Sequence, residues 1–218
     1  MTGNVFSISP VLYVLVPFAF LLGSIPFGLI FTKSKGIDLR STGSKNIGAT
    51  NVLRSAGKLP ALFTLLGDMI KGAIPVLLCR YILGNIDVPI RADERIIAED
   101  LWPGIVGLSA VLGHMFSVFL SFKGGKGVAT GLGVMLAYSP AVAGIMLLIW
   151  ITVVLIFRIS SLAAITAVTL MPIIFIMLGA SYVKVTIGII IAAFIIYKHK
   201  SNIKNLIAGT ESRIGGKS

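Results

Sequence analysis

Long apolar segments, separated only by short polar stretches, limit this chain to a helical fold inside a membrane. A helix that crosses a bilayer needs roughly 20 apolar residues. Of the 218 residues, 56% are hydrophobic and only 12% are charged, whereas soluble domains carry about 25% charged residues. We predict an all-α, polytopic membrane protein of about seven transmembrane helices, built as a single domain over residues 1–218. The apolar segments occupy about 10–32, 60–83, 102–120, 127–139, 141–157, 160–178 and 182–198.

The fourth and fifth segments form one long apolar run that is interrupted only at Ser139-Pro140. Proline removes a helix donor and restricts the residue before it, so two helices are expected here. A single kinked helix is the alternative, and it would change the topology.

Positive charge is distributed unevenly along the chain. With the amino terminus outside, 14 of the 19 Lys and Arg residues fall on the inner side, and the outer segment 84–100 holds five of the eight acidic residues. Because an excess of Lys and Arg marks the cytoplasmic side, we predict an external amino terminus and a cytoplasmic carboxyl terminus.

The net charge of +11 is then explained by topology and by contact with anionic membrane lipids. No extended basic domain remains for nucleic acid. The single cysteine, Cys79, excludes an internal disulfide and a cysteine-based metal cluster, and we predict neither a catalytic metal nor a cofactor. The amino-terminal MTGNVFSISP lacks Lys and Arg, so the first segment is expected to be retained and not cleaved as a signal peptide.

The first polar stretch, GSKNIGATNVLR at 43–54, combines features of an anion site. Its glycines allow close approach of backbone amides to a ligand, and successive amides form an anion-binding concavity. Thr50 and Arg54 would share one face of a short helix whose free first-turn N–H groups point at the anion. The alternative is an interfacial helix that is merely capped by Ser44 or Asn46.

The second stretch, KGGKGVATG at 123–131, places three glycines around two lysines directly before an apolar helix. Bare amides, a helix N-terminus and cations together favour a phosphate. It is not a Walker A loop, because Gly127 follows Lys126 where Ser or Thr is required. The alternative is a flexible turn whose lysines only set the topology.

The third stretch, HKSNIKNLIAGTE at 199–211, follows the last span. His199 and Asn202 are three residues apart and would share a helical face, and Glu211 is a third candidate. The alternative is a solvated, mobile tail.

Three ionisable residues lie in or at the end of apolar segments. Asp68 and Lys71 have the i, i+3 spacing that permits mutual neutralisation, so we predict a buried structural pair. His114 ends the third segment and is expected to be a structural hydrogen-bonding residue.

Over nearly its whole length the chain resembles the bacterial membrane acyl-phosphate:glycerol-3-phosphate acyltransferases. The resemblance rests on GSIPFG in the first segment and on GSKNIGATNVLR, GHMFSVFLSFKGGKGVATG and HKSNIKNLIAGTE in that order. It implies a multi-pass enzyme of seven spans in the bacterial inner membrane, with a cytoplasmic active site.

The implied reaction moves a fatty acyl group from acyl phosphate to the 1-hydroxyl of glycerol 3-phosphate. It gives phosphate and 1-acyl-glycerol 3-phosphate, in the first acylation of phospholipid synthesis. Acyl phosphate is an activated mixed anhydride, so positioning and charge stabilisation are the main requirements. Either His199 or the substrate phosphate would accept the hydroxyl proton.

From the residues and the resemblance together we predict catalytic residues Ser44, Lys126, His199 and Asn202. Predicted substrate and phosphate ligands are Asn46, Thr50, Arg54, Lys123, Gly124, Gly125, Gly127 and Glu211. The expected partners are the two substrates and membrane lipids. The alternative function is a small phosphate or organic-anion transporter, whose polar groups would lie near the bilayer midplane.

Overall fold

A computed structural model of the chain describes residues 9–86 and 92–215, and every regular element within these ranges is helical. In chain order the helices are α1 Pro10–Ser24, α2 Phe27–Lys33, α3 Ala49–Ala56, α4 Lys58–Asn85, α5 Ala92–Met115, the 3-10 turn η1 Val118–Leu120, α6 Val128–Tyr138, α7 Pro140–Phe157, α8 Ser160–Met177, α9 Tyr182–Lys198 and α10 Lys200–Ile207.

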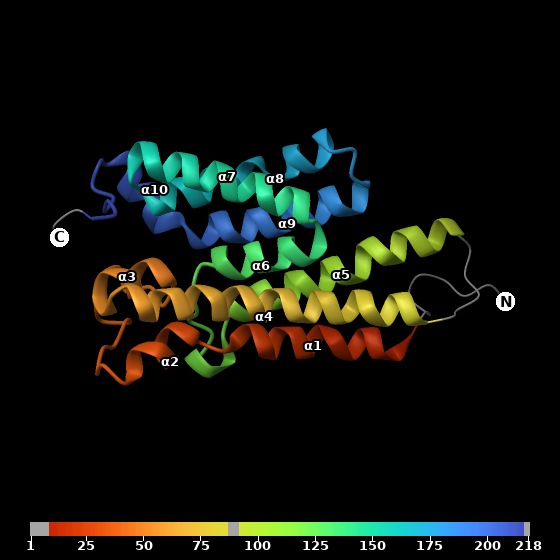
Figure 1. Ribbon diagram of the computed structural model, residues 1–218, viewed down its shortest axis with the longest axis horizontal. Helices are drawn as coiled ribbons and strands as arrows, with labels where there is room; N and C mark the ends of the chain where they lie inside the picture. Colours follow the sequence, from red (N-terminus) through yellow and green to blue (C-terminus); the bar gives the residue numbers. More distant parts are fainter. Residues whose placement is uncertain (1–8, 87–91, 216–218) are drawn as a thin grey trace.

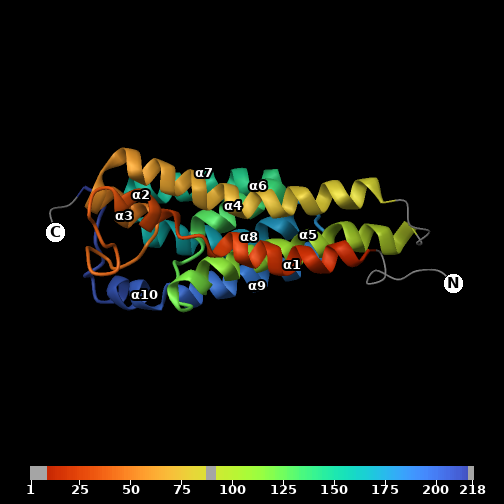
Figure 2. The same ribbon diagram turned by 90° about the horizontal axis from the view of Figure 1, so that it is seen from below.

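The molecule is an elongated bundle in which the longer helices run back and forth along one axis (Figures 1 and 2). The short helices α2, α3 and α10 gather at one end, together with the last described residues. Helix α1 begins at the opposite end. Helices α1 and α5, α4 and α6, and α7 and α8 pack as neighbours. This arrangement brings the polar stretches of distant parts of the sequence to one end of the bundle.

Within the described residues, five segments are long and apolar enough to cross a membrane, and six if the bent pair α9 and α10 counts as one span. They are residues Pro10–Lys33, Lys58–Asn85, Ala92–Leu120, Pro140–Phe157 and Ser160–Met177, with the bent pair Tyr182–Lys198 and Lys200–Ile207. Helix α6 has only 11 residues, which corresponds to about 16 Å at 1.5 Å per residue. The predicted all-helical, multi-pass membrane architecture is confirmed, whereas a count of seven spans stays a prediction.

The structure differs from the prediction in two segments. The first apolar segment is broken after Ser24, where Pro26 cannot donate a backbone hydrogen bond. The third segment begins ten residues earlier than predicted, at Ala92. Its α-helix ends at Met115, and the candidate span continues to Leu120, the predicted end. Acidic residues in its first turn interact favourably with the helix dipole, which explains why part of the expected outer loop is helical.

The break at Ser139-Pro140 separates two helices, as predicted. Pro140 occupies the first position of α7, where its missing N–H costs nothing. The chain reverses direction between α6 and α7 (Figure 1), and the two helices pack against each other. The alternative of one kinked helix is therefore excluded.

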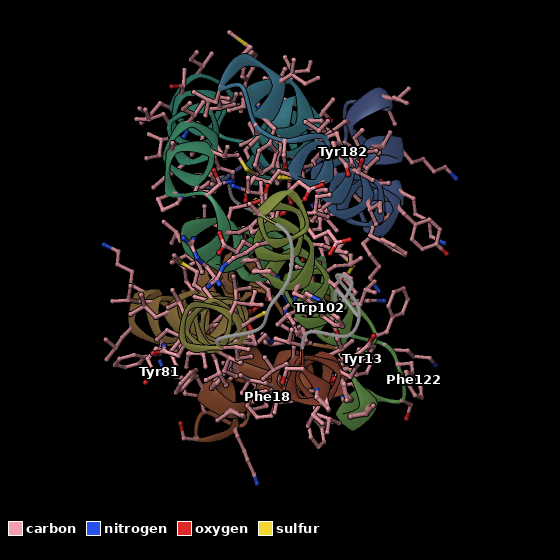
Figure 3. The ribbon with its side chains drawn as sticks, turned by 90° about the vertical axis from the view of Figure 1, so that its right-hand side faces the viewer. Tyr13, Phe18, Tyr81, Trp102, Phe122 and Tyr182 are labelled. Atoms are coloured by element: carbon pink, nitrogen blue, oxygen red, sulfur yellow. The ribbon has the colours of Figure 1, made fainter. Side chains whose placement is uncertain are left out.

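Helix α5 forms the centre of the bundle. It contacts α1, α4, α6 and α9, and in the view along the bundle it lies among the other helices (Figure 3). Its Trp102 is buried and meets Tyr13 edge-to-face at 4.8 Å between ring centroids. Tyr81 and Phe122 are exposed on the outside of the bundle (Figure 3), where lipid would surround a membrane protein.

Reciprocal glycine contacts bring helix backbones together. A Cβ added to Gly23 of α1 would overlap Ala110 of α5, and one added to Gly113 of α5 would overlap Phe20 of α1. Small residues permit this close approach in membrane helices. Helices α4 and α6 meet in the same way, through Gly72 against Thr130 and Gly133 against Met69.

Candidate active site

A cavity of about 390 Å³ brings the three polar stretches together. Its lining includes residues of all three stretches, which are Ser44, Asn46, Thr50, Asn51 and Arg54, Lys126 and Gly127, and His199, Asn202 and Glu211. Three stretches that lie far apart in the sequence thus meet in one cavity. The lining also includes apolar residues of four helices, which are Leu65, Met69, Leu132, Met146, Leu147, Trp150, Ala164 and Ala167.

The first stretch is folded around the buried side chain of Asn51. Its Nδ2 donates to the carbonyls of Thr42 (3.0 Å) and Asn46 (2.8 Å), and its Oδ1 accepts from the backbone N–H of Ser44 (3.0 Å). Gly43 has a φ of +59°, and a side chain there would overlap the Asn51 amide. The sequence analysis did not select Asn51 as a site residue. The one signal for it in the sequence was its position in the first turn of a predicted short helix.

Helix α3 begins without a side-chain cap at Gly48, so the expected alternative of a cap from Ser44 or Asn46 is wrong. Thr50 and Arg54 both line the cavity, which confirms their predicted common face. Thr50 Oγ1 lies 3.1 Å from Ser160 Oγ, and Arg54 Nη2 donates to the carbonyl of Ser212 (3.2 Å).

The second stretch contributes Lys126 and Gly127 to the cavity lining. Gly127 has a φ of +84° directly before α6, a conformation that favours glycine. Lys123 is exposed and does not line the cavity.

The amides of Gly124 and Gly125 do not serve as free anion donors. They donate to the carbonyls of Met115 (3.1 Å) and His114 (3.0 Å). Neither glycine has room for a side chain, because a Cβ would overlap the His114 carbonyl or its imidazole. These glycines therefore let the loop pack closely on the end of α5.

The third stretch is ordered by a polar network and is not a free tail. Lys126 Nζ donates to Asn202 Oδ1 (2.5 Å), and Asn202 Nδ2 donates to Glu211 Oε1 (2.7 Å). Ser161 Oγ donates to the same carboxylate oxygen (2.6 Å). Asn202 lies on α10, which leaves α9 at a bend of 63°. His199 occupies this bend, and the bend turns the third stretch toward the second.

His199 is oriented by a hydrogen bond of 2.8 Å between its Nδ1 and the Ile195 carbonyl. A proton on Nδ1 satisfies this carbonyl and leaves Nε2 as the basic nitrogen of the neutral ring. Burial lowers the pKa of His199, which lies just beyond the end of α9. Burial also lowers the pKa of Lys126 in its loop, and Glu211 opposes that effect.

Ser160 and Ser161 complete the polar end of the cavity, and sequence reasoning missed both. They begin α8 directly after the short connection at Arg158 and Ile159. Their available signal in the sequence was a pair of hydroxyls between two predicted spans, next to Arg158.

The predicted pair of Asp68 and Lys71 is confirmed, with 2.7 Å between Asp68 Oδ1 and Lys71 Nζ. His114 of α5 faces the same carboxylate at 3.6 Å. Asp68 and His114 also line the cavity, so the buried pair reaches the site.

Comparison with known proteins identifies the family. The model of the family "Glycerol-3-phosphate acyltransferase" matches residues 13–209. The chain belongs to this family.

Relatives named glycerol-3-phosphate acyltransferase match over almost their whole length. The protein of Geotalea daltonii is 43% identical over 199 residues, which cover 91% of this chain and 95% of that one. The protein of Methylobacillus flagellatus is 46% identical over 207 residues, covering 92% and 95%.

The fold is similar to crystal structures of PlsY (YgiH), an integral membrane glycerol 3-phosphate acyltransferase. Its glycerol 3-phosphate form has a TM-score of 0.83 and 42% identity, with 94% of this chain and 96% of that chain covered. Its lysophosphatidic acid form has a TM-score of 0.81 and 41% identity, with 94% and 95% covered.

Proposed function

We propose that this chain transfers a fatty acyl group from acyl phosphate to the 1-hydroxyl of glycerol 3-phosphate. The products are 1-acyl-glycerol 3-phosphate and inorganic phosphate. The observation that carries the proposal is a single cavity whose polar end holds Arg54 and Lys126 and whose walls are apolar. Such a cavity suits a substrate that has an anionic head and a hydrocarbon tail. The names of the relatives support acyl transfer to glycerol 3-phosphate.

The polar end would bind the phosphate groups of the two substrates. Arg54 and Lys126 supply positive charge, and Ser44 and the first-turn amides of α3 supply neutral donors. Gly127 allows the backbone to approach a ligand closely. We leave Lys123, Gly124 and Gly125 out of the binding groups, since Lys123 is exposed and both amides are engaged.

The groups around Asn202 would hold glycerol 3-phosphate. An amide both donates and accepts, which matches adjacent hydroxyl and phosphate oxygens. Asn46, Thr50 and His199 also line the cavity and add polar contacts. Glu211 fixes the Asn202 amide through a hydrogen bond, so that its carbonyl faces Lys126.

In the chemical step, the 1-hydroxyl oxygen forms a bond to the acyl carbonyl carbon. The bond from that carbon to the phosphate oxygen breaks, and phosphate leaves with the bonding electron pair. Holding both substrates in register would contribute roughly 7–11 kcal/mol. Each donor aimed at the developing oxyanion would contribute about 3–4 kcal/mol. The hydroxyl proton passes to a phosphate oxygen of the substrate, and no cofactor is required.

A transporter of phosphate or organic anions is not favoured. Its polar groups would be expected near the middle of the bundle. Here the polar stretches meet in a cavity beside α3 and α10, at one end of the bundle, and the relatives are acyltransferases.

For the topology we propose seven passes through the bacterial inner membrane, with the amino terminus outside and the active site on the cytoplasmic face. The seven passes would be the five long apolar segments, the bent pair α9 and α10, and the short apolar helix α6. The distribution of Lys and Arg supports the orientation. Arg91 and Lys217, two of the cations used for that argument, lie outside the described residues. The whole chain would form one membrane-embedded acyltransferase domain.

The test is phosphate release by the purified protein in detergent or liposomes. Palmitoyl phosphate should release phosphate only when glycerol 3-phosphate is added, and mass spectrometry should detect an equal amount of 1-palmitoyl-glycerol 3-phosphate. Glycerol in place of glycerol 3-phosphate is the matched control. Phosphate release without glycerol 3-phosphate, or release without the lipid product, would overturn the proposal.

A further inference from the structure

We infer that His114 is a positioning residue that holds the loop carrying Lys126, with the buried pair of Asp68 and Lys71 facing the other side of its ring. The inference rests on the proposed acyl transfer, in which Lys126 binds phosphate. It gives a role to a buried charged cluster that the reaction itself does not use.

His114 fixes the loop through both its backbone and its ring. Its carbonyl accepts the N–H of Gly125 at 3.0 Å, and the next carbonyl, of Met115, accepts the N–H of Gly124 at 3.1 Å. Its Nε2 occupies the space into which a side chain at position 125 would project. The loop therefore rests on the imidazole one residue before Lys126.

The other side of the ring faces the buried ion pair. Nδ1 of His114 is 3.6 Å from Asp68 Oδ1, too long for a hydrogen bond, and it has no hydrogen-bond partner among the described residues. Asp68 pairs with Lys71, whose Nζ also donates to the carbonyl of Ile25 at 2.6 Å. Contacts thus run from the break between α1 and α2, through α4 and α5, to the loop.

Packing alone is a poor reason to keep this cluster. A buried ion pair is often no more stabilising than apolar residues of similar volume, and an unpartnered buried ring nitrogen is a cost. Such groups can instead fix one arrangement of the surrounding chain. Here the arrangement that they fix places Lys126 within reach of Asn202.

A double-mutant cycle tests the contact between ring and loop. In Gly125→Ala the new methyl group would displace the loop, and we expect kcat/KM to fall at least tenfold. His114→Ala should also lower kcat/KM, by about tenfold, because the loop loses its support. In the double variant the missing imidazole makes room for the methyl group. Its kcat/KM should exceed that of Gly125→Ala at least threefold.

Two matched controls accompany the cycle. Gly144→Ala adds the same methyl group to α7 where nothing lies within 4 Å. Ser109→Ala removes a buried hydrogen bond of α5 to the Val16 carbonyl, away from the loop. Both should keep kcat/KM within about twofold. The inference would be overturned if the fold-losses of kcat/KM in the two single variants multiplied in the double variant. Full activity of Gly125→Ala would overturn it as well.

A conservative variant covers the case in which Gly125→Ala does not fold, as judged by gel filtration and thermal unfolding. His114→Asn keeps a polar group near Nδ1 and should recover at least threefold of the activity lost in His114→Ala at an unchanged Tm. If His114→Ala and His114→Asn lose the same amount of activity, and each loss accompanies a fall in Tm, His114 contributes only to packing and the inference is overturned. An inactive wild-type protein would instead refute the proposed function, so the two failures are distinguishable.

Discussion

Lys126 Nζ donates a hydrogen bond of 2.5 Å to Asn202 Oδ1, across 76 residues of sequence. This contact joins the loop before α6 to the first turn of α10. Glu211 accepts from the same amide group through Oε1, so a cation and a carboxylate are linked by one asparagine. A phosphate that binds Lys126 would therefore meet a lysine whose position is already fixed.

The two lysines of the glycine-rich loop should differ sharply. Lys126→Met should lower kcat/KM at least tenfold, because it removes a charge-assisted contact worth about 1.5–3 kcal/mol. Lys123→Met should change it less than threefold, since Lys123 is exposed outside the cavity. Steady-state kinetics on both variants make the comparison. Equal losses would mean that general surface charge, and not a defined site, drives the reaction.

Arg54→Ala should behave like Lys126→Met. Its kcat/KM should fall at least tenfold for at least one of the two substrates, glycerol 3-phosphate and acyl phosphate. Its guanidinium lines the cavity and is anchored to the Ser212 carbonyl. Lys33→Ala, at the exposed end of α2, is the control and should retain wild-type kinetics. Arg54 would have no role in the site if its variant matched the control.

The pH profile should distinguish the two candidate proton acceptors. A histidine base must be neutral, so its loss of activity on acidification would follow the pKa of His199, which burial lowers below the ordinary value of about 6.5. A phosphate group titrates at about 6 and accepts the proton only above that pH. We expect His199→Gln to keep the acidic limb at reduced amplitude, because the substrate phosphate is the acceptor.

Measurement of kcat/KM from pH 5 to 9 in the wild-type protein and in His199→Gln decides the point. A flat acidic side in the variant would identify His199 as the base. Full activity in both His199→Gln and Asn202→Ala would instead show that neither residue contributes to the site.

The predicted orientation can be checked with introduced cysteines. Gly209→Cys should resist membrane-impermeant thiol reagents in intact cells, while Ala92→Cys should react. Gly209 follows α10 and Ala92 begins α5. Helix α10 and the start of α5 lie at opposite ends of the bundle (Figure 1). Cys79 is buried and gives a low background. The reverse labelling pattern would refute an external amino terminus.

Most of the helical architecture was predictable because apolar length and breaking residues are local signals. Pro140 marked the division between α6 and α7, and Thr50 and Arg54 were placed correctly on one face of α3. The loops were harder, because their amides are used by partners far away in the sequence. Nothing in KGGKG itself shows that Gly124 and Gly125 donate to Met115 and His114.

The contacts of the third stretch, residues 199–211, were also not predictable from local sequence. The bend at His199 places Asn202 beside Lys126, and this bend depends on packing that sequence spacing does not contain. The sequence signal of Ser161 was weak, since a hydroxyl at the start of an apolar helix resembles an ordinary helix-start residue, and its contact with Glu211 is visible only in the structure.

The close approach of α4 and α6 predicts that one added methyl group will have a large effect on stability. Gly133→Ala should lower stability by about 1–3 kcal/mol through overpacking, because its methyl group would overlap the Met69 backbone. Gly144→Ala is the control and should leave the Tm equal or slightly higher. Thermal unfolding in one detergent compares them, and equal Tm values would contradict backbone contact between the two helices.

The reciprocal glycine contacts also bear on how mutational surveys of this chain should be interpreted. Gly23, Gly113, Gly72 and Gly133 leave no volume for even one methyl group, so a saturation library selected for growth should return almost only glycine at each of them. These four glycines would then tolerate as few substitutions as Lys126 does. A map of essential residues would therefore mark helix crossings and reacting groups alike, and only assays on purified, folded variants would separate the two.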